Sequence, residues 1–434
     1  MGNKIKDSIP KSRFVRIIPI SLIMYMVAYM DRNNIGFAFD GMADSLHLSP
    51  GLIGTAGGIF FLGYVLLQIP AGYLASRFST AKILFITQII WGILACSTAF
   101  VQNGTQLLVI RFILGMAEAA LYPCLLVLIA RWFPLSERAR ANSLWQLGAP
   151  ISSLIMGPIS GIIVTNHDWR WMFIIQGFPA LLIAIVWLFV IKDSPDKVKL
   201  LSKEEREYLR TEQAKDEQAA AKNITVKQNF WKGTFTNPKV WILCFSYFLM
   251  NMGAYGVALW LPKIIQNLTH SGYTTVGFIS ILPAAAGIIG LYVNASHSDR
   301  TGERRWHAAL ALILGGTCLL LSTFTSQYVI ISVIFLVLTS MFAGGFGAVF
   351  WSIPPMILNP SALGPSIGLI NGIGNLGGFF GPMIVGTLIG QSGSTTLGLI
   401  FLAISYICGG LCVTLVKLKS KQQESSKESF TLEA

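Results

Sequence analysis

Four ionisable residues lie inside stretches of the chain that otherwise avoid charge: Asp31, Arg32, Arg111 and Glu118. A charge in membrane hydrocarbon is costly, so each such residue needs a partner, a water-filled cavity or a functional role. Arg111 and Glu118 are seven residues apart, almost two helical turns, so they share one helix face and lie about 10 Å apart. That separation is too long for an ion pair between them, and each therefore needs a partner on another element.

Asp31 and Arg32 offer these partners, because adjacent residues point about 100° apart around a helix. We expect Asp31 near Arg111, and Arg32 near Glu118. Two permanent buried salt bridges would satisfy the same charges, but buried ion pairs often stabilise no better than apolar packing. The alternative is a switch in which a proton neutralises Glu118 and releases Arg32 to bind a carboxylate through its planar guanidinium.

The elements that hold these residues are long apolar segments. Of the 434 residues, 53% are hydrophobic and 12% charged, whereas soluble domains carry about 25% charged residues. Apolar runs of about 20 residues recur, each long enough to cross a bilayer as a helix. We predict an all-α membrane protein with twelve transmembrane helices, at 17–39, 51–74, 83–101, 106–130, 142–165, 171–191, 240–262, 273–296, 307–325, 328–357, 363–390 and 395–416.

The net charge of +12 follows membrane topology. If both termini are cytoplasmic, 28 of the 32 Lys and Arg residues fall in the tails and inner loops. This is the positive-inside distribution, and it predicts a multi-pass protein of the plasma (inner) membrane with cytoplasmic N- and C-termini. The expected partner surface is the lipid bilayer and not nucleic acid, and we expect a monomer.

The two halves of the chain look duplicated. One span ends in GYLASRFSTAK (72–82) and another in ASHSDRTGERR (295–305), which places Arg77 and Arg300 223 residues apart. Gly-Pro pairs at 157–158 and 381–382 are 224 residues apart. Parallel six-helix repeats are a known transporter plan, with the substrate site between the halves near the midplane.

The repeat predicts the domain organisation. Two six-helix bundles are expected at 1–192 and 238–418, joined by a cytoplasmic linker at 193–237 and followed by a cytoplasmic tail at 419–434. The linker has mixed charge at helical spacing, so we expect a solvated connector with one or two surface helices. A regulatory role is the alternative.

The loop motif SHSDRTGERR (296–305) resembles the cytoplasmic signature of the major facilitator superfamily. Its first copy departs from the pattern, because Ser76 stands where Asp is usual and Ser79 where Gly is usual; we expect a weaker contact between the halves there. The resemblance implies the major facilitator fold and a conformational role for five residues: Arg77, Asp299, Arg300, Gly302 and Arg304.

Further motifs narrow the resemblance to the anion:cation symporter family, which includes carriers of sugar acids, tartrate and aromatic acids. They are YMDRNNIGFA (29–38), RFILGMAEAALYP (111–123), RWFPLSERARA (131–141), DWRWMFII (168–175) and NGIGNLGGFFGP (371–382). The resemblance covers essentially the whole chain. It implies proton coupling at the acids Asp31 and Glu118 and anion binding at the arginines Arg32 and Arg111.

Polar and aromatic residues near these charges are candidates to line a substrate pocket, which typically combines apolar walls with a few placed donors. The candidates are Tyr29, Tyr64, Gln68, Trp351, Ser352, Asn371 and Asn375. Ordinary packing is the alternative for the aromatics and interhelical hydrogen bonding for the asparagines, although family position favours Asn371 as a ligand. For Trp260 we favour a membrane-interface position over a gate.

These observations predict a proton-coupled symporter that imports a small organic anion, most favourably a hydroxylated carboxylate such as a sugar acid or tartrate, by alternating access. Within carriers the alternatives are an organic anion exchanger, a drug-type exporter or an aromatic-acid carrier. A channel or sensor that keeps the fold is a different class. An enzyme is not expected, because we find no nucleophile–base pair. The sequence also predicts no metal site and no cofactor beyond the coupling proton.

Overall fold

The computed structural model describes residues 12–195, 198, 201–222, 234–358 and 360–416. Regular structure in these residues is entirely helical. Twelve of the helical segments are long and apolar enough to cross a membrane, from Ser12–Leu46 to Thr396–Thr414. The prediction of an all-α protein with twelve membrane helices is therefore confirmed. The predicted tail at 419–434 lies outside the described residues.

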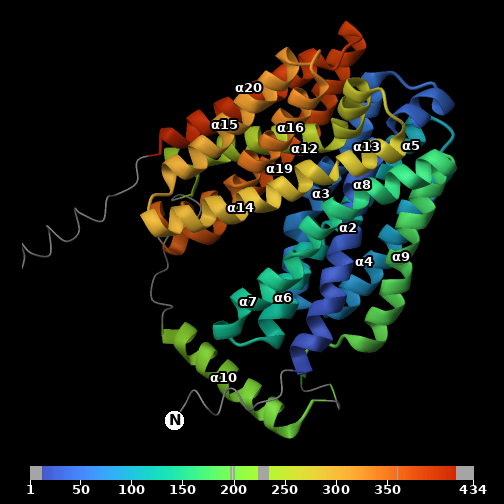
Figure 1. Cartoon of the computed structure of the whole chain (residues 1–434). Helices are drawn as coiled ribbons and strands as arrows, with labels where there is room; N and C mark the ends of the chain where they lie inside the picture. The colour runs from blue at the N-terminus through green and yellow to red at the C-terminus, as the bar shows by residue number, and fades with distance from the viewer. Residues whose placement is uncertain (1–11, 196–197, 199–200, 223–233, 359, 417–434) are drawn as a thin grey trace, which may run out of the picture. The chain divides into compact units, whose positions relative to one another are not determined.

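Two compact units make up the chain, one comprising Met1–Val226, Ala258–Ile281 and Pro382–Gly390, and the other Lys227–Val257, Leu282–Gly381 and Gln391–Ala434. The helices α12 (Pro238–Thr269) and α19 (Pro360–Ser392) contribute to both units (Figure 1). Parts of the second half thus pack with the first, and the domain bounds expected from the sequence stay a prediction.

The first unit is built mainly from the helices of the first half. They are α2 (Ser12–Leu46), α3 (Pro50–Arg77), α4 (Thr80–Ser97), η1 (Thr98–Phe100), α5 (Gly104–Glu118), α6 (Leu121–Trp132), α7 (Leu135–Gln146), α8 (Gly148–Asn166), α9 (Trp169–Val190) and α10 (Lys203–Lys222), together with α13 (Tyr273–Ile279).

Prolines divide two of the membrane segments in this unit. The fourth segment is interrupted between α5 and α6, directly after Glu118, because Pro123 has no N–H to donate to the Ala119 carbonyl. The fifth is interrupted between α7 and α8, where Pro150 leaves the Gln146 carbonyl without a helical donor. The first of these breaks places a candidate proton-carrying residue at a helix end.

The second unit contains α14 (Ile281–Thr301), α15 (Arg305–Phe324), α16 (Val329–Gly344), α17 (Phe346–Phe350), α18 (Pro354–Ile357) and α20 (Thr396–Thr414). The continuous tenth helix predicted at 328–357 is wrong, because regular α-helix is lost around Trp351 and Ser352. Pro354 and Pro355 cannot donate to the carbonyls one turn earlier, so the chain turns there. The two candidate residues consequently lie at a turn.

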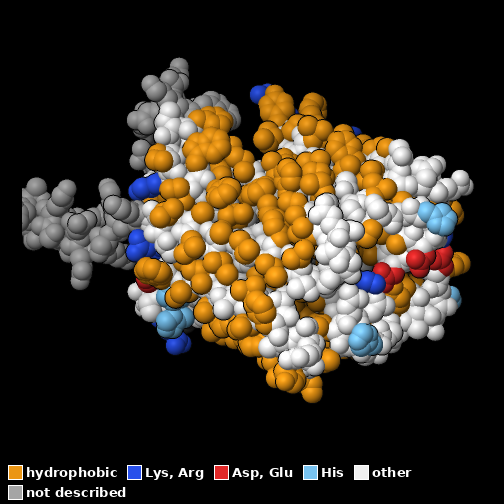
Figure 2. Space-filling model, turned by 90° about the horizontal axis from the view of Figure 1, so that it is seen from above, with side chains coloured by type: hydrophobic (Ala, Val, Ile, Leu, Met, Phe, Trp, Pro, Cys, Tyr) orange, Lys and Arg blue, Asp and Glu red, His pale blue; other side chains and the backbone are white. Residues whose placement is uncertain are grey.

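Hydrophobic side chains cover most of the face shown in Figure 2, and charged and histidine side chains gather at its edges. Many of the exposed residues are large and apolar, among them Phe189, Ile330 and Tyr292, which are 72%, 76% and 73% exposed. Water disfavours such a surface, whereas the hydrocarbon of a bilayer accommodates it.

Within the first unit, the linker helix α10 (labelled in Figure 1) contacts α2 and α7. The Arg13 guanidinium of α2 is 1% exposed and pairs with Glu205 of α10 and Glu137 of α7, each at 2.7 Å. Ser12 also donates to the Glu205 carboxylate, and Gln213 donates to the Arg131 carbonyl at 2.7 Å. The expected surface helix is therefore present, but it is not solvated on all sides, because Glu205 and Leu209 are buried.

We expect Glu205→Gln to lower the stability of the detergent-solubilised protein by about 3 kcal/mol, the usual cost of breaking one side of a buried ion pair. Glu205 is fully buried against Arg13, and Gln leaves that charge with one fewer anion. Glu207→Gln is the matched control, because Glu207 is exposed on the same helix. Thermal unfolding measures both; equal melting temperatures for the two variants would contradict a structural role of this contact.

Candidate functional site

The centre of the candidate site is an ion pair between Arg32 of α2 and Glu118 of α5. The Arg32 Nη2 atom lies 3.1 Å from Glu118 Oε2, and the two side chains are 8% and 0% exposed. The second carboxylate oxygen, Oε1, is buried and has no hydrogen-bond donor among the residues that the structure describes. This half of the expected crossed arrangement is present, and it holds opposite charges away from water within a membrane segment.

Arg111 lies next to Asp31, as the crossed arrangement predicts, but its hydrogen bonds go to the backbone and not to the Asp31 carboxylate. Its Nη1 and Nη2 atoms donate to the backbone carbonyls of Asp31 and Arg32, at 3.4 and 3.3 Å. The Asp31 carboxylate accepts a hydrogen bond from the Trp91 indole N–H of α4, at 3.3 Å. Arg111 thus binds the backbone of α2 at the two residues, Asp31 and Arg32, that carry the charged side chains. This contact positions the Arg32 side chain.

Aromatic rings surround the Arg32 guanidinium. Its centre lies 4.9 Å from the Tyr64 ring, 5.1 Å from Phe60 and 6.0 Å from Tyr29. Arg111 approaches the same Phe60 ring at 5.3 Å, so one aromatic ring stabilises two guanidiniums through cation–π attraction. The predicted site residues Tyr29 and Tyr64 are therefore brought to Arg32, and Gln68 lies one helical turn beyond Tyr64, half-buried.

Close packing of α3 against α5 sets these positions. A Cβ atom on Gly63 would collide with the backbone carbonyl oxygen of Phe112, and one on Gly115 with that of Phe60. Only glycine permits such a close approach of two helix backbones. The two glycines therefore place Tyr64 and Glu118 on facing backbones.

A second aromatic cluster lies on α2, α6 and α7 in the same unit. Tyr25 packs edge-on against Trp145 at 4.9 Å and lies 6.3 Å from Tyr122 and 6.4 Å from Tyr29. The Tyr122 hydroxyl donates to Gln146 at 3.3 Å. Tyr25 was not predicted as a site residue, although its i, i+4 spacing from Tyr29 is a sequence signal for this cluster.

The four candidates from the second half lie in the second unit. Trp351 packs edge-on against Tyr247 at 5.0 Å, and Ser352 donates to the Val349 carbonyl at 2.6 Å. Asn371 is half-buried, and Asn375 is 8% exposed. On α19, Gly374 lies between the two asparagines, and a Cβ there would meet the Tyr247 ring. Tyr247 thus lies against both Trp351 and the part of α19 that carries the asparagines, and the role of the four candidates as ligands stays a prediction.

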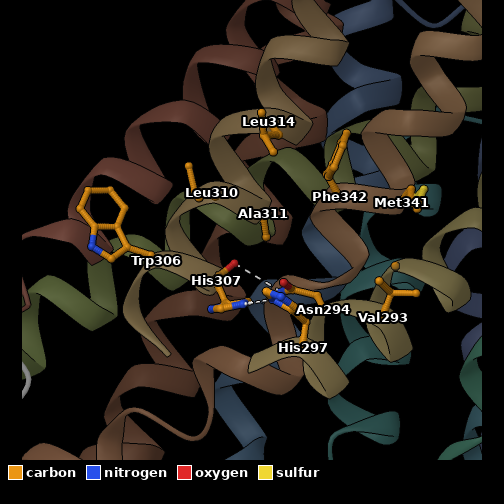
Figure 3. A pocket seen from close by; sticks show the side chains of 11 residues that line it. Val293, Asn294, His297, Trp306, His307, Leu310, Ala311, Leu314, Met341 and Phe342 are labelled. Atoms are coloured by element: carbon orange, nitrogen blue, oxygen red, sulfur yellow. Dashed lines mark hydrogen bonds between the residues drawn. The ribbon is translucent and has the colours of Figure 1, made fainter. Parts of the chain in front are cut away.

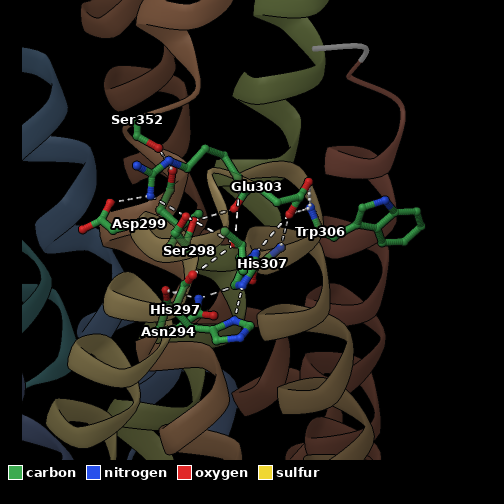
Figure 4. Close-up of polar contacts among 12 residues, drawn as sticks. Asn294, His297, Ser298, Asp299, Glu303, Trp306, His307 and Ser352 are labelled. Atoms are coloured by element: carbon green, nitrogen blue, oxygen red, sulfur yellow. Dashed lines mark hydrogen bonds and ion pairs between the residues drawn. The ribbon is translucent and has the colours of Figure 1, made fainter. Parts of the chain in front are cut away.

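The loop motif of the second half forms a compact polar network (Figure 4). Arg304 pairs with Asp299 at 2.6 Å and donates to Ser298 at 3.0 Å. Gly302 has a φ of +69°, which favours glycine at this turn. Burial would raise the pKa of Glu303. The carboxylate accepts hydrogen bonds from the backbone N–H groups of Trp306 and His307, however, and these hold its pKa below the ordinary value.

The first copy of the motif uses a different acid. Asp193, after α9, accepts hydrogen bonds from the hydroxyls of Ser79 and Thr80 and from the Ala81 N–H, at 2.5, 3.1 and 3.0 Å. Partial burial would raise the pKa of Asp193, but these hydrogen bonds and Arg131 hold it below its ordinary value. Asp193 caps α4 from outside the motif, while Arg77 lies 5.4 Å from the Tyr73 ring.

We expect Asp193→Asn to lower the melting temperature by a few degrees at pH 7, because the amide cannot accept all three hydrogen bonds. A depressed carboxyl pKa adds stability above the unfolded-state value of about 3.9, and this contribution is lost as the pH falls through the folded-state pKa. The deficit should therefore shrink in acid. Asp168→Asn, at an exposed ion pair with Arg170, is the control; a deficit that does not change with pH would count against the carboxylate.

The sequence favours a membrane-interface position for Trp260, but the structure buries this residue. It is 4% exposed, packs against Phe39 at 4.8 Å, and donates from its indole N–H to the Pro382 carbonyl at 3.1 Å. Nearby, Asp40 of α2 pairs with Lys263 at 2.8 Å and accepts from the Tyr273 hydroxyl at 2.9 Å. Within the first unit, these contacts tie α2 to α12 and α13.

Among the described residues, no group of three or more His, Cys, Asp or Glu side chains has an arrangement that could hold a metal ion. A chain of buried hydrogen bonds also lies in the first unit. Asn34 donates to Gln176 at 3.0 Å, and Gln176 donates to Ser160 at 2.8 Å.

Twelve helical segments able to cross a membrane, together with a buried ion pair within the first unit, are typical of a polytopic membrane transport protein. The model of the Major Facilitator Superfamily matches residues 21–382 and, in a second match, 274–432. The chain belongs to this superfamily, and it is a carrier rather than an enzyme.

Similar proteins agree with this assignment. A protein named putative tartrate transporter from Agrobacterium vitis is 35% identical over 89% of this chain and 86% of its own length. A quinolone resistance transporter from Acinetobacter baumannii is 32% identical over 97% of each chain. A crystal structure of a bacterial homolog of the human lysosomal transporter Spinster shares the fold, with a TM-score of 0.73, 14% identity and coverage of 94% and 96%. The tartrate relative is consistent with the anion:cation symporter family that the motifs indicate.

Proposed function

We propose that the protein is a proton-coupled symporter that imports a small organic anion, foremost a hydroxylated carboxylate such as tartrate or a sugar acid. The observation that carries the proposal is the buried contact of 3.1 Å between Arg32 and Glu118. A guanidinium whose anionic partner can take up a proton is a binding site that a substrate carboxylate can occupy in exchange.

The exchange follows from charge balance. When a proton from the outside neutralises Glu118, Arg32 loses the anion that stabilises it in a low-dielectric site and attracts a carboxylate. When the proton leaves toward the inside, Glu118 attracts Arg32 again and the substrate is displaced. One proton per monoanion makes this cycle electroneutral, and a second proton, carried by Asp31, makes it electrogenic.

The surroundings of Arg32 favour a hydroxylated substrate. The phenol groups of Tyr29 and Tyr64 and the amide of Gln68 supply hydrogen-bonding groups beside the cation. The relative from Agrobacterium vitis is named a putative tartrate transporter, and tartrate carries two hydroxyls between two carboxylates. In the second unit, we assign substrate binding to Trp351, Ser352, Asn371 and Asn375.

The remaining parts of the proposal concern the setting. The carrier is placed in the plasma membrane with both termini in the cytoplasm, acts as a monomer, and uses the proton alone, without a cofactor. Arg77, Asp299, Arg300, Gly302 and Arg304 have conformational roles in alternating access.

Reconstituted uptake tests the function. Purified protein in liposomes is given an imposed pH gradient, acid outside, and a panel of radiolabelled tartrate, sugar acids, aromatic acids and uncharged sugars. We expect saturable accumulation of a hydroxylated carboxylate that collapses when an ionophore removes the gradient. Uptake that equilibrates without saturation would indicate a channel, and uphill uptake that is the same without a gradient would contradict proton coupling.

An exporter is the second candidate, because the quinolone resistance relative matches 97% of the chain at 32% identity. The Gly157-Pro158 pair resembles an antiporter motif, but in the first unit Gly157 packs against the Gly277 backbone, which simple close packing explains. Liposomes preloaded with quinolone separate the candidates. Quinolone efflux that drives proton uptake would favour the exporter.

A further inference from the structure

A pocket of about 400 Å³ lies within the second unit, between α14, α15 and α16 (Figure 3). Its volume is in the range of about 300–1,000 Å³ that is usual for small-molecule sites. Most of its wall is apolar, and a few polar side chains gather at one end. The lining residues that the argument uses are Asn294, His297, His307, Leu310 and Leu314.

The polar end is preorganised by a chain of hydrogen bonds (Figure 3). The Glu303 carboxylate lies 3.0 Å from His307 Nδ1, and His307 Nε2 lies 2.7 Å from His297 Nδ1. A carboxylate fixes the proton on the histidine nitrogen that it faces, so in the neutral pair His307 Nε2 accepts and His297 Nδ1 donates. Asn294 is held in turn by the Gly345 carbonyl, at 2.8 Å.

Charge at this end of the pocket is positive on balance. Between α14 and α15 the motif carries Arg300, Arg304 and Arg305, but only the two acids Asp299 and Glu303. Asp299 is paired with Arg304, and Glu303 accepts from the N-terminus of α15 and from His307. Arg305 lies over the Trp306 ring, 5.5 Å from its centre, and Trp306 lines the pocket. This rim complements an anion.

The other end of the pocket opens along the helices. Leu310 and Leu314 line it and are 45% and 40% exposed, although both lie within a membrane-spanning segment. A side opening of this kind admits an apolar chain from the bilayer. Trp306, 46% exposed near the start of its span, is the residue type that marks the boundary between hydrocarbon and headgroups.

We propose that this pocket binds an anionic phospholipid, with one acyl chain along the apolar wall and the headgroup phosphate at the basic end beside Arg305. The apolar wall, the basic rim and the depth of the site at the membrane boundary each match one part of such a molecule. The bound lipid would contact both α14 and α15, the helices that the conformational loop motif connects.

Native mass spectrometry of the full chain, purified in detergent, tests the proposal. The probes are phosphatidylglycerol and phosphatidylcholine with identical acyl chains. We expect one phosphatidylglycerol to bind at least about fivefold more tightly than phosphatidylcholine, which corresponds to one basic side chain near the headgroup. Soluble glycerol 3-phosphate should not displace it, because the acyl chain is required.

Two variants locate the site. Leu314→Trp fills the apolar end and should weaken phosphatidylglycerol binding at least about fivefold, whereas Leu411→Trp, at a 50% exposed position on α20 outside the pocket, should not. Arg305→Gln should reduce phosphatidylglycerol binding about fivefold and leave phosphatidylcholine binding unchanged; it decides the matter if Leu314→Trp does not fold. Equal affinity for the two lipids, displacement by glycerol 3-phosphate, or wild-type binding by Arg305→Gln would overturn the proposal.

Discussion

Glu118→Gln is expected to abolish uphill accumulation while leaving counterflow intact. In the proposed cycle, a monoanion accumulates about tenfold for each unit of imposed pH difference, because one proton moves with each anion. Gln has nearly the same size as Glu and keeps an oxygen for Arg32, but it cannot titrate. The variant resembles the protonated state permanently, so it should bind and exchange substrate without responding to the gradient. Accumulation should fall to the passive distribution.

Three controls make this result specific. Glu118→Asp keeps a titratable carboxyl and should keep gradient-driven accumulation, at a reduced rate because the shorter side chain reaches Arg32 less well. Glu207→Gln makes the same chemical change at an exposed site outside the ion pair and should behave as wild type. Counterflow by Glu118→Gln shows that the variant is folded. If it still accumulated substrate about tenfold per pH unit, Glu118 would not be the coupling residue.

The structure confirms the general arrangement of the charged residues and changes one detail. Helical geometry alone placed Arg111 and Glu118 on one face and required partners from elsewhere, and Arg32 does meet Glu118. The partner of Asp31 could not be derived, because Trp91 comes from α4 and no spacing rule connects it to residue 31. The carbonyls that Arg111 binds could not be derived either, since carbonyl orientation depends on the local course of α2.

The structure differs from the sequence-based predictions at three further places. In two of them a tertiary contact overrides the local sequence pattern, and in the third the local pattern itself indicates the observed structure. Trp260 has the residue type and position of an interface residue, but Phe39 and the Pro382 carbonyl bury it. The linker has the mixed charge of a solvated helix, yet Arg13 draws Glu205 inward. By contrast, the break around Trp351 could have been predicted, because the paired prolines that follow are visible in the sequence.

Arg32→Gln is expected to remove the preference for a carboxylate, and Arg32→Lys to weaken it. The wild type should bind the acid at least about tenfold more tightly than the amide of the same substrate, since a hydrogen-bonded charge contributes about 1.5–3 kcal/mol. The Arg32 guanidinium lies beside the Tyr64 and Phe60 rings, at 4.9 and 5.1 Å from their centres, in a site suited to a flat cation. Lysine keeps the charge but loses the bidentate fork and stacks less well on the rings.

Competition binding with acid and amide pairs measures this preference directly, independently of coupling. Arg111→Lys is the matched control, because Arg111 is also a buried guanidinium near Phe60 but its hydrogen bonds go to the carbonyls of Asp31 and Arg32. That substitution should lower thermal stability and leave the acid-to-amide ratio close to wild type. The opposite pattern, with the ratio lost in Arg111→Lys and kept in Arg32→Gln, would move the anion site to Arg111 and leave Arg32 only as the structural partner of Glu118.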